Sequence, residues 1–348
     1  MASVKRLIIA AGIVLCFTQS PLAHTKSDSY QSILSRLLNN QPVINIVDDF
    51  LVFWDYAQDE TPRVQRRLWK RMVETKYQDY FDRAVYRTTD PQIRRAILDD
   101  FLIRVPSQVE AIREFNRSIA DLPTSPLVES VILFQSRFRE YRQQGALYIG
   151  LSMFRFDGAV RPVQNDEGVP DTLCLGAEVL ADYSREQLRV AITHEFFHLY
   201  HFGFFFEDAD EMSPAEFCTP HIPLMIEGMA AAGAQEVLPY ETPETYLHFD
   251  RDELAAQQQD LAYNAGQFLD LIRESAPPEQ YQQWFTRAHL GDAPPRGGYL
   301  LGYEVTKRLM AVYTIDEMVR MTPAELREHA EEQLTAMANE RILLMATH

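Results

Sequence analysis

The sequence predicts a mainly helical α+β protein with one small β-sheet. Apolar residues recur at three- and four-residue spacing over residues 29–120 and again after residue 240, as on the buried side of amphipathic helices. Between these stretches, residues 146–180 change to the pattern of strands. Hydrophobic residues make up 46% of the 348 residues, which is enough for one large core or two cores of moderate size.

The N-terminal part of the mature chain is expected to be helical. Its aromatic residues, such as Trp54 and Trp69, are interpreted as packing residues of these helices rather than as a ligand-binding surface. Pro123 and Pro126 interrupt the pattern, so a helical N-terminal region (24–122) is separated here from a second domain (123–348). The expected helices cover residues 30–39, 43–58, 62–80, 91–104, 107–120 and 127–143.

Two strands are expected in the middle of the chain. Residues 146–156 and 172–180 have the composition of strands, and the dipeptide Asp157-Gly158 between them is typical of a turn. These features favour a sheet that includes β-hairpin connections. After residue 240 the helical pattern returns, and two Pro-Pro pairs, at 277–278 and 294–295, mark loops.

The most informative motif is His194-Glu195-Phe196-Phe197-His198, inside an apolar segment that is expected to be a helix. Positions i and i+4 of a helix lie on one side, so both imidazoles can face a single metal ion. Glu195 lies on the adjoining flank, within reach of a water molecule held by that ion. Catalytic zinc usually has three protein ligands and keeps the fourth position for water, so a third ligand is required.

Glu227 is the best candidate for the third ligand. It follows Pro223 in a second helical run, and small residues follow it between Gly228 and Gly233. Small side chains would let this helix pack closely against the first and bring a carboxylate to the same ion. The alternative is an ordinary acidic residue in the first turn of a helix, where the helix dipole favours it.

These motifs resemble those of the gluzincins, in which the third zinc ligand is a Glu on a second helix. More narrowly, the sequence resembles predicted zinc-dependent proteases of bacteria, which share H-E-x-x-H, an E-G-x-A motif (here residues 227–230) and a late Gly-Tyr-rich segment (here residues 297–303). The resemblance covers about residues 125–320. It implies a zincin-like core in which His194, His198 and Glu227 bind one Zn²⁺ per chain, with Glu195 as the general base.

The resemblance does not identify a substrate, and the peptidase interpretation of the site predicts a peptide or protein. In zincins an edge strand of the sheet pairs with the extended substrate, and either residues 146–156 or residues 172–180 would be that strand. Tyr299 or Tyr303 would donate a hydrogen bond to the developing oxyanion, and Arg296 would bind a substrate carboxylate or carbonyl. The alternative for this segment is a Gly-rich turn that leads into a helix over residues 303–313, with both tyrosines in the core.

The chain departs from other zincins in two places. A metzincin would have Gly and His where this chain has His201 and Phe204. Thermolysin-like enzymes carry an Asp at the position of Ala231, so another residue must orient the ligand histidines. The sequence does not rank the candidates for that role, which are Asp208, Asp210, Glu211 and Glu236.

Two further histidines leave alternatives open. His201 shares the helix face of the two ligand histidines, so it would support them, contact the substrate, replace Glu227 as a ligand, or be solvated at the helix end. His221 precedes the Glu227 helix and is a weaker alternative ligand.

The N-terminus predicts export. Lys5 and Arg6 precede an apolar run of about eleven residues, which suits a signal peptide (residues 1–23, cleaved after Ala23) and is short for a membrane span of about twenty. An uncleaved apolar helix is the alternative. We therefore expect a periplasmic or secreted protein without stable membrane insertion. The net charge of −17 disfavours nucleic acid and anionic membranes as partners.

Removal of the signal peptide would leave two cysteines, Cys174 and Cys218. In an oxidising compartment they would either form a disulfide or stay buried and reduced.

The sequence therefore favours an exported zinc metallopeptidase. Two alternatives are a zinc hydrolase of another amide or ester and a non-catalytic binding or folding protein with a structural zinc site. A structural zinc site normally has four protein ligands, so His201 or His221 would have to complete it.

Overall fold

The computed structural model describes residues 30–164, 171–205, 218–286 and 293–346. Helices surround one small mixed sheet, which confirms the expected mainly helical α+β class. The elements up to the sheet are α1 Tyr30–Leu37, β1 Val43–Asn45, α2 Val47–Ala57, α3 Pro62–Trp69, η1 Lys70–Glu74, α4 Gln78–Tyr80, η2 Phe81–Tyr86, α5 Pro91–Arg104, η3 Val105–Ser107, α6 Val109–Ala120, α7 Pro126–Arg137, β2 Leu147–Gly150, β3 Gly158–Arg161 and β4 Thr172–Gly176. After the sheet follow α8 Ala177–Leu180, α9 Arg185–Phe205, α11 His221–Val237, α12 Pro243–Leu247, α13 Arg251–Gln259, α14 Leu261–Arg273, α15 Pro278–Tyr281, η5 Gln282–Phe285, α16 Gly297–Leu309, α17 Ile315–Met318 and α18 Pro323–Ala346.

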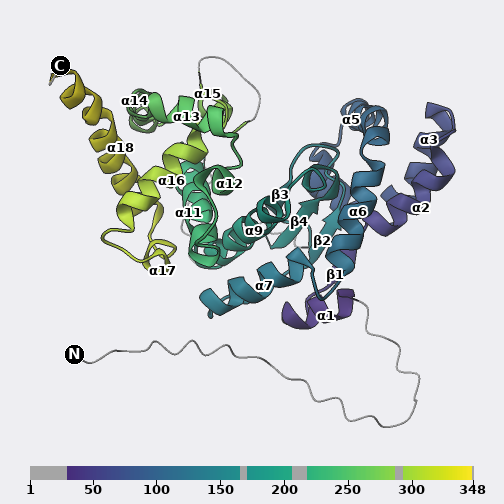
Figure 1. The fold of residues 1–348 in the computed structure, drawn as a ribbon. Helices are drawn as coiled ribbons and strands as arrows, with labels where there is room; N and C mark the ends of the chain where they lie inside the picture. The colour runs from purple at the N-terminus through teal and green to yellow at the C-terminus, as the bar shows by residue number, and fades with distance from the viewer. Residues whose placement is uncertain (1–29, 165–170, 206–217, 287–292, 347–348) are drawn as a thin grey trace, which may run out of the picture.

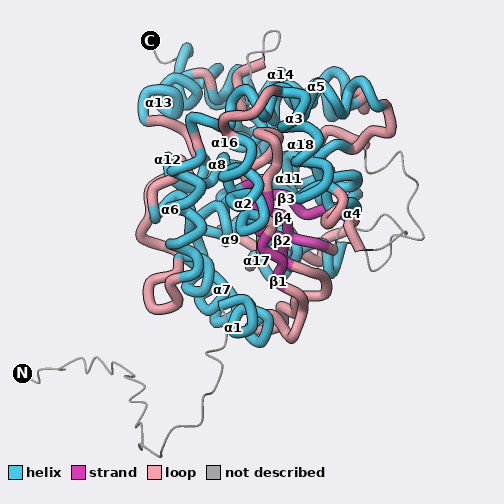
Figure 2. The backbone as a smooth tube through the Cα atoms, turned by 90° about the vertical axis from the view of Figure 1, so that its right-hand side faces the viewer, coloured by secondary structure: helices cyan, strands magenta, loops and turns pink. Residues whose placement is uncertain are grey.

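Within the described residues, the sheet has four strands in the order β1-β2-β4-β3. β1, β2 and β4 run parallel, and β3 pairs antiparallel with β4. Every residue of β2 and β4 is buried, as is usual for parallel strands that are covered on both faces. Figure 2 shows the strands in the middle of the molecule with helices around them.

The expected strand arrangement is wrong in three respects. Residues 146–156 and 172–180 do contain β2 and β4, but these strands are parallel and interior, so neither is the edge strand. Asp157-Gly158 is not a turn between them, because Gly158 begins the edge strand β3. The segment 43–58 opens with the short strand β1, which pairs with β2. Strand partners and direction depend on contacts distant in sequence, which local alternation of residues does not contain.

The helices agree better with their sequence patterns. α5 has the predicted bounds, because Asp90 accepts hydrogen bonds from the backbone N–H groups of Gln92 and Ile93 and Pro91 occupies the first position. The continuous helix expected over residues 62–80 is instead α3, followed by the π-helical turn η1 and the short helix α4.

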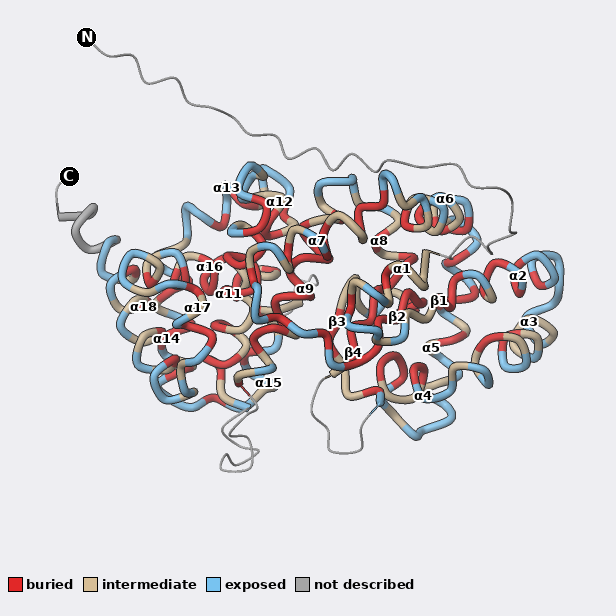
Figure 3. Tube along the Cα trace, turned by 90° about the horizontal axis from the view of Figure 1, so that it is seen from below, coloured by how far each residue is buried: buried red, intermediate tan, exposed pale blue. Residues whose placement is uncertain are grey.

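Helix α9 lies between the two halves of the molecule. Figures 1 and 3 show the sheet with α1–α6 on one side of it and α11–α18 on the other. α9 packs on β3 and β4 and also on α11 and α7. One apolar core runs through both halves, and Figure 3 shows it as buried segments on both sides of α9. The proposed domain boundary near residue 122 stays a prediction, although β1 from the N-terminal region belongs to the same sheet.

None of the described helices is both long enough and apolar enough to cross a membrane. The predicted signal peptide, residues 1–23, lies outside the described residues.

Candidate metal centre

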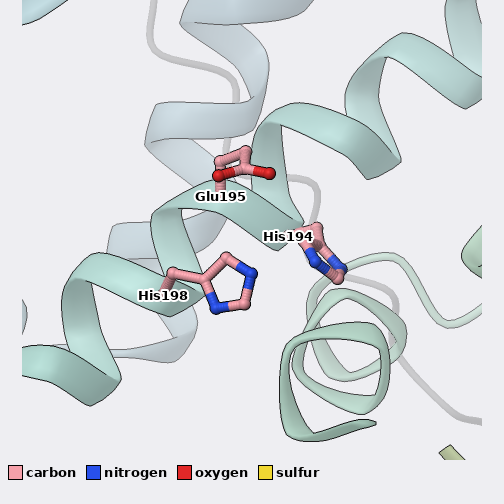
Figure 4. A group of neighbouring side chains, drawn as sticks. All are labelled: His194, Glu195 and His198. Atoms are coloured by element: carbon pink, nitrogen blue, oxygen red, sulfur yellow. The ribbon is translucent and has the colours of Figure 1, made fainter. Parts of the chain in front are cut away.

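Helix α9 brings His194, Glu195 and His198 together. The three residues are 8%, 7% and 6% exposed, because α9 is covered by the sheet on one side and by α11 on the other. One potential ligand atom of each residue lies within 4.8 Å of those of the others. Figure 4 shows the two imidazoles and the carboxylate, which come from successive turns of α9. The helix spacing thus places two imidazoles and a carboxylate in one buried site that could hold a metal ion.

Glu227 of α11 meets both histidines. Its Oε2 atom lies 3.1 Å from Nε2 of His194 and 3.4 Å from Nε2 of His198. A tetrahedral zinc ion bonded to nitrogen and oxygen at about 2.0–2.1 Å holds such ligand atoms about 3.3 Å apart. The Glu227 oxygen is therefore at the distance from each imidazole nitrogen that a shared zinc ion requires.

Close helix packing brings Glu227 to this position. On α11, a Cβ atom at Gly233 would lie 2.7 Å from Cγ of Phe197 on α9, so only glycine allows this approach. Gly228 packs instead on α16, where its Cβ would lie 2.7 Å from Cα of Gly302. The small residues therefore serve two neighbours, with Gly233 facing α9 and Gly228 facing α16.

The two carboxylates of the site have opposite pKa shifts. Burial alone would raise the pKa of Glu227, but the charges and hydrogen bonds of His198 and His194 hold it below its usual value. Burial raises the pKa of Glu195 to about 8, and the charge of Asp157 adds to this effect against that of His198. Opposed shifts of this kind in neighbouring groups are typical of functional sites. A divalent cation beside Glu195 would favour its ionised form.

Residues 157–328 match a family model. Its description is "Predicted Zn-dependent protease (DUF2268)". The matched segment begins just before β3, contains all of α9, α11 and α16, and ends within α18. No curated protein and no solved structure matches the chain. The match and the cluster on α9 together support the expectation of a zinc-dependent protease at this level of description.

Glu195 lies against the edge strand β3. A Cβ atom at Gly158 would overlap Cγ of Glu195 and would lie 2.6 Å from its Cδ and 2.8 Å from its Oε1. Sequence reasoning missed this contact, because it assigned Gly158 to a turn. The preceding Asp157 accepts hydrogen bonds from the hydroxyl of Tyr183 at 2.6 Å and from the Gly158 N–H at 2.9 Å.

The two tyrosines of the late segment have different surroundings. α16 begins at Gly297, so this segment is the first part of the helix rather than a turn that precedes it. The ring centroid of Tyr299 lies 6.4 Å from that of His194. The hydroxyl of Tyr303 donates to Oε1 of Gln235 at 2.9 Å, on α11. Tyr299 is therefore beside the metal-binding residues, while Tyr303 is engaged in packing between helices.

His201 is not a solvated residue. It is fully buried, and its ring lies among the rings of Phe197, Phe202 and Phe205. Burial lowers the pKa of His201 to about 3, so its ring is neutral. The helix extends to Phe205 and is covered there, which the helical spacing alone could not reveal.

His221 lies away from the cluster, next to α18. It is buried there, and burial and the charge of Arg327 lower its pKa to about 4. The candidate metal-binding cluster among the described residues consists of His194, Glu195 and His198, without His201 or His221. Glu227 is not part of that cluster either, but its Oε2 atom lies within 3.4 Å of both imidazoles.

Glu236, the described candidate for orienting His194 and His198, pairs with another residue. Glu236 forms an ion pair with Arg137 at 3.1 Å, which occupies its carboxylate. Asp208, Asp210 and Glu211 lie outside the described residues. Within the described part of the chain, Nδ1 of His194 and Nδ1 of His198 have no hydrogen-bond partner.

The two cysteines do not form a disulfide. Cys174 is a buried thiol in β4, and Cys218 is an exposed thiol just before α11. Burial raises the pKa of the Cys174 thiol well above its usual value.

Proposed function

We propose that the protein is a zinc-dependent peptidase of the gluzincin type, with His194, His198 and Glu227 as zinc ligands. The observation that carries this proposal is the position of one Glu227 oxygen, at 3.1 and 3.4 Å from the two imidazole nitrogens. The family description supports the zinc-dependent protease part of the proposal.

In this proposal Glu195 is the general base. Zinc held by the three ligands would supply a Lewis acid for the substrate carbonyl and would lower the pKa of a water molecule to about 7. Glu195 takes the proton of the attacking water and later gives it to the leaving amide nitrogen. Gly158 has no Cβ atom, so β3 can approach this carboxylate without a steric clash.

We assign stabilisation of the developing oxyanion to Tyr299 rather than to Tyr303. The ring of Tyr299 is a neighbour of His194, whereas the hydroxyl of Tyr303 is already bonded to Gln235. Burial and the charge of Glu227 raise the pKa of Tyr299 well above its usual value, so its hydroxyl keeps the proton that it donates.

The strand beside Glu195 is suited to bind an extended peptide. β3 is at the edge of the described sheet, and its first residue, Gly158, touches Glu195. A peptide that pairs with the outer side of β3 would pass the general base, with backbone hydrogen bonds to the strand. This assigns to β3 the role that the sequence suggested for β2 or β4.

The same site could hydrolyse another amide or an ester, because the chemistry of the attacking water is the same. A structural zinc site fits the geometry less well. It would need a fourth protein ligand. His201 and His221 lie outside the cluster, so Glu195 itself would have to bind the ion, and zinc content of Glu195→Gln distinguishes this case because that variant would then lose zinc.

The test combines zinc content with activity on a mixed peptide substrate. Glu195→Gln should keep stoichiometric zinc while kcat/KM falls by about 10²–10⁴, the usual contribution of a general base. Glu227→Ala should lose zinc, whereas Glu236→Ala, which removes a carboxylate from the same helix, should keep it. Full activity of zinc-loaded Glu195→Gln, or undiminished zinc in Glu227→Ala, would contradict the proposal.

We also propose that the protein is exported and acts on peptides outside the cytoplasm. The charged and apolar pattern of residues 5–23 supports this proposal. Mass spectrometry of the native protein should find an N-terminus near His24 in an extracytoplasmic fraction. An intact Met1 in the cytosol would contradict it.

A further inference from the structure

Arg296 places a positive charge next to the proposed active site. It immediately precedes α16, and its guanidinium carbon lies 4.2 Å from the ring centroid of Tyr299. The Tyr299 ring lies in turn beside the ring of His194. Both Arg296 and Tyr299 are partly exposed, so part of this surface remains accessible.

The charge of Arg296 contacts the Tyr299 ring but no carboxylate in the described part of the chain. Its side chain forms no ion pair or hydrogen bond there, and its Nε atom is buried without an acceptor. Asp157 is near enough for Arg296 to lower its pKa, but its two oxygens accept hydrogen bonds from Tyr183 and Gly158. Other arginines of the C-terminal helices, such as Arg308, do pair with carboxylates.

The backbone of Arg296 is also unfavourable for stability. Its φ of 54° is in the left-handed region, which costs free energy for a residue with a side chain. In addition, its cation lies at the N-terminus of α16, where the helix dipole favours negative charge. A cation with no hydrogen-bonded carboxylate, a left-handed backbone and a position at the N-terminus of a helix thus coincide at one residue. Such coincidences are expected where function outweighs stability.

We propose that Arg296 binds a carboxylate of the substrate and so selects peptides that carry one near the cleaved bond. A guanidinium recognises a carboxylate by two parallel hydrogen bonds, and the Tyr299 ring beneath it would hold it in place. The carboxylate is the C-terminal α-carboxylate or an Asp or Glu side chain. Arg296 is separated from His194 only by the Tyr299 ring, and an extended peptide advances about 3.3 Å per residue, so this carboxylate lies within about three residues of the cleaved bond. This inference rests on the proposed peptidase function.

The proposal is tested with matched peptides. A mixed set of short peptides is prepared, each with a free C-terminus or a C-terminal amide, and with each acidic side chain present or replaced by its amide. The wild-type protein should prefer one carboxylate form by about 10- to 100-fold in kcat/KM. Arg296→Gln should lose that preference, so that the ratio of kcat/KM between the carboxylate and amide forms falls to about one. Arg296→Lys should keep part of the preference.

Arg87→Gln is the matched control, because Arg87 is an exposed arginine with a similar left-handed backbone (φ 49°) on another element. This variant should leave kcat/KM unchanged for the carboxylate and the amide forms of the peptides. Equal cleavage of all forms by the wild-type protein, or equal loss on all forms in Arg296→Gln, would overturn the role of Arg296.

A binding measurement separates this inference from the proposed function. Fluorescence anisotropy of the same peptides on zinc-loaded Glu195→Gln should show the same preference, and the Glu195→Gln, Arg296→Gln double variant should lack it. If cleavage is absent but this preference is present, the peptidase proposal fails and carboxylate binding stands. If the preference is absent, the role of Arg296 is wrong whatever the protein cleaves.

Discussion

Replacement of Gly158 by alanine should reduce activity without removing the metal. The added Cβ would lie 2.6 Å from Cδ of Glu195, whereas non-bonded carbon atoms approach to about 3.5–4.0 Å. The carboxylate of Glu195 must therefore move by about 1 Å or β3 must withdraw from α9. The φ of Gly158 does not require glycine, so the effect is steric rather than conformational.

A displacement of about 1 Å in a catalytic group costs on the order of 10² in rate. We therefore expect kcat/KM of Gly158→Ala to fall by about 10²-fold, with zinc content unchanged because the overlap involves Glu195 and not the three proposed ligands. Overpacking should also lower the free energy of unfolding by about 1–3 kcal/mol. The measurements are kcat/KM, zinc per chain and urea unfolding on the same preparation.

Gly266→Ala provides the control for this experiment. A Cβ atom at Gly266 would lie 3.8 Å from Cβ of Ala338, which is an ordinary contact, and Gly266 is inside helix α14. This variant should keep full activity and gain about 0.5–1 kcal/mol in stability. A folded, zinc-loaded Gly158→Ala with wild-type kcat/KM would refute the role of Glu195. Loss of zinc from Gly158→Ala would instead indicate that Glu195 binds the metal.

Two further predictions concern buried groups. Burial lowers the pKa of His201 to about 3. Below pH 6.5 this histidine is therefore protonated in the unfolded chain but stays neutral in the folded chain. The free energy of unfolding consequently decreases as the pH falls from about 6.5 towards 3. In chelator-treated protein, His201→Leu should be at least as stable as wild type at pH 7.5. Below pH 6.5 its free energy of unfolding should exceed that of wild type by an amount that grows by up to about 1.4 kcal/mol per pH unit. Urea unfolding at a series of pH values measures this difference, and a difference that does not change with pH would contradict the prediction. In the native protein, iodoacetamide should modify the exposed Cys218, and the buried Cys174 should react only after denaturation; equal reaction of both thiols in peptide mass spectra would show that β4 is not buried as described.

The metal-binding cluster could be predicted because it depends on local spacing. The two histidines and Glu195 are fixed by one helix, and the apolar residues around them indicate that this helix is buried. The third proposed ligand was predicted from a neighbouring motif, and the structure brings its oxygen to both imidazoles. Helix α5 was predicted to its bounds for a similar reason, since Asp90 and Pro91 act within one turn.

Features that depend on distant parts of the chain were not predicted. Val43 pairs with Leu147 in the sheet, and no local signal distinguishes this short strand from the start of helix α2. The contact between Gly158 and Glu195 also requires the position of β3 relative to α9. Likewise, helical spacing suggested that His201 lies on the side of His194 and His198 but could not show that phenylalanine rings surround it.

The shared contact of His194 and His198 with Glu227 has a consequence for the mechanics of the chain. A metal ion at these residues would be a crosslink between α9 and α11, across a segment whose ends, His194 and Glu227, are 33 residues apart. A covalent crosslink over a loop of this length removes about 3–4 kcal/mol of chain entropy from the unfolded state. The described cysteines form no disulfide, so the ion would be a reversible crosslink between the two helices. Amide exchange in α11 and in the end of α9 would then report metal occupancy directly.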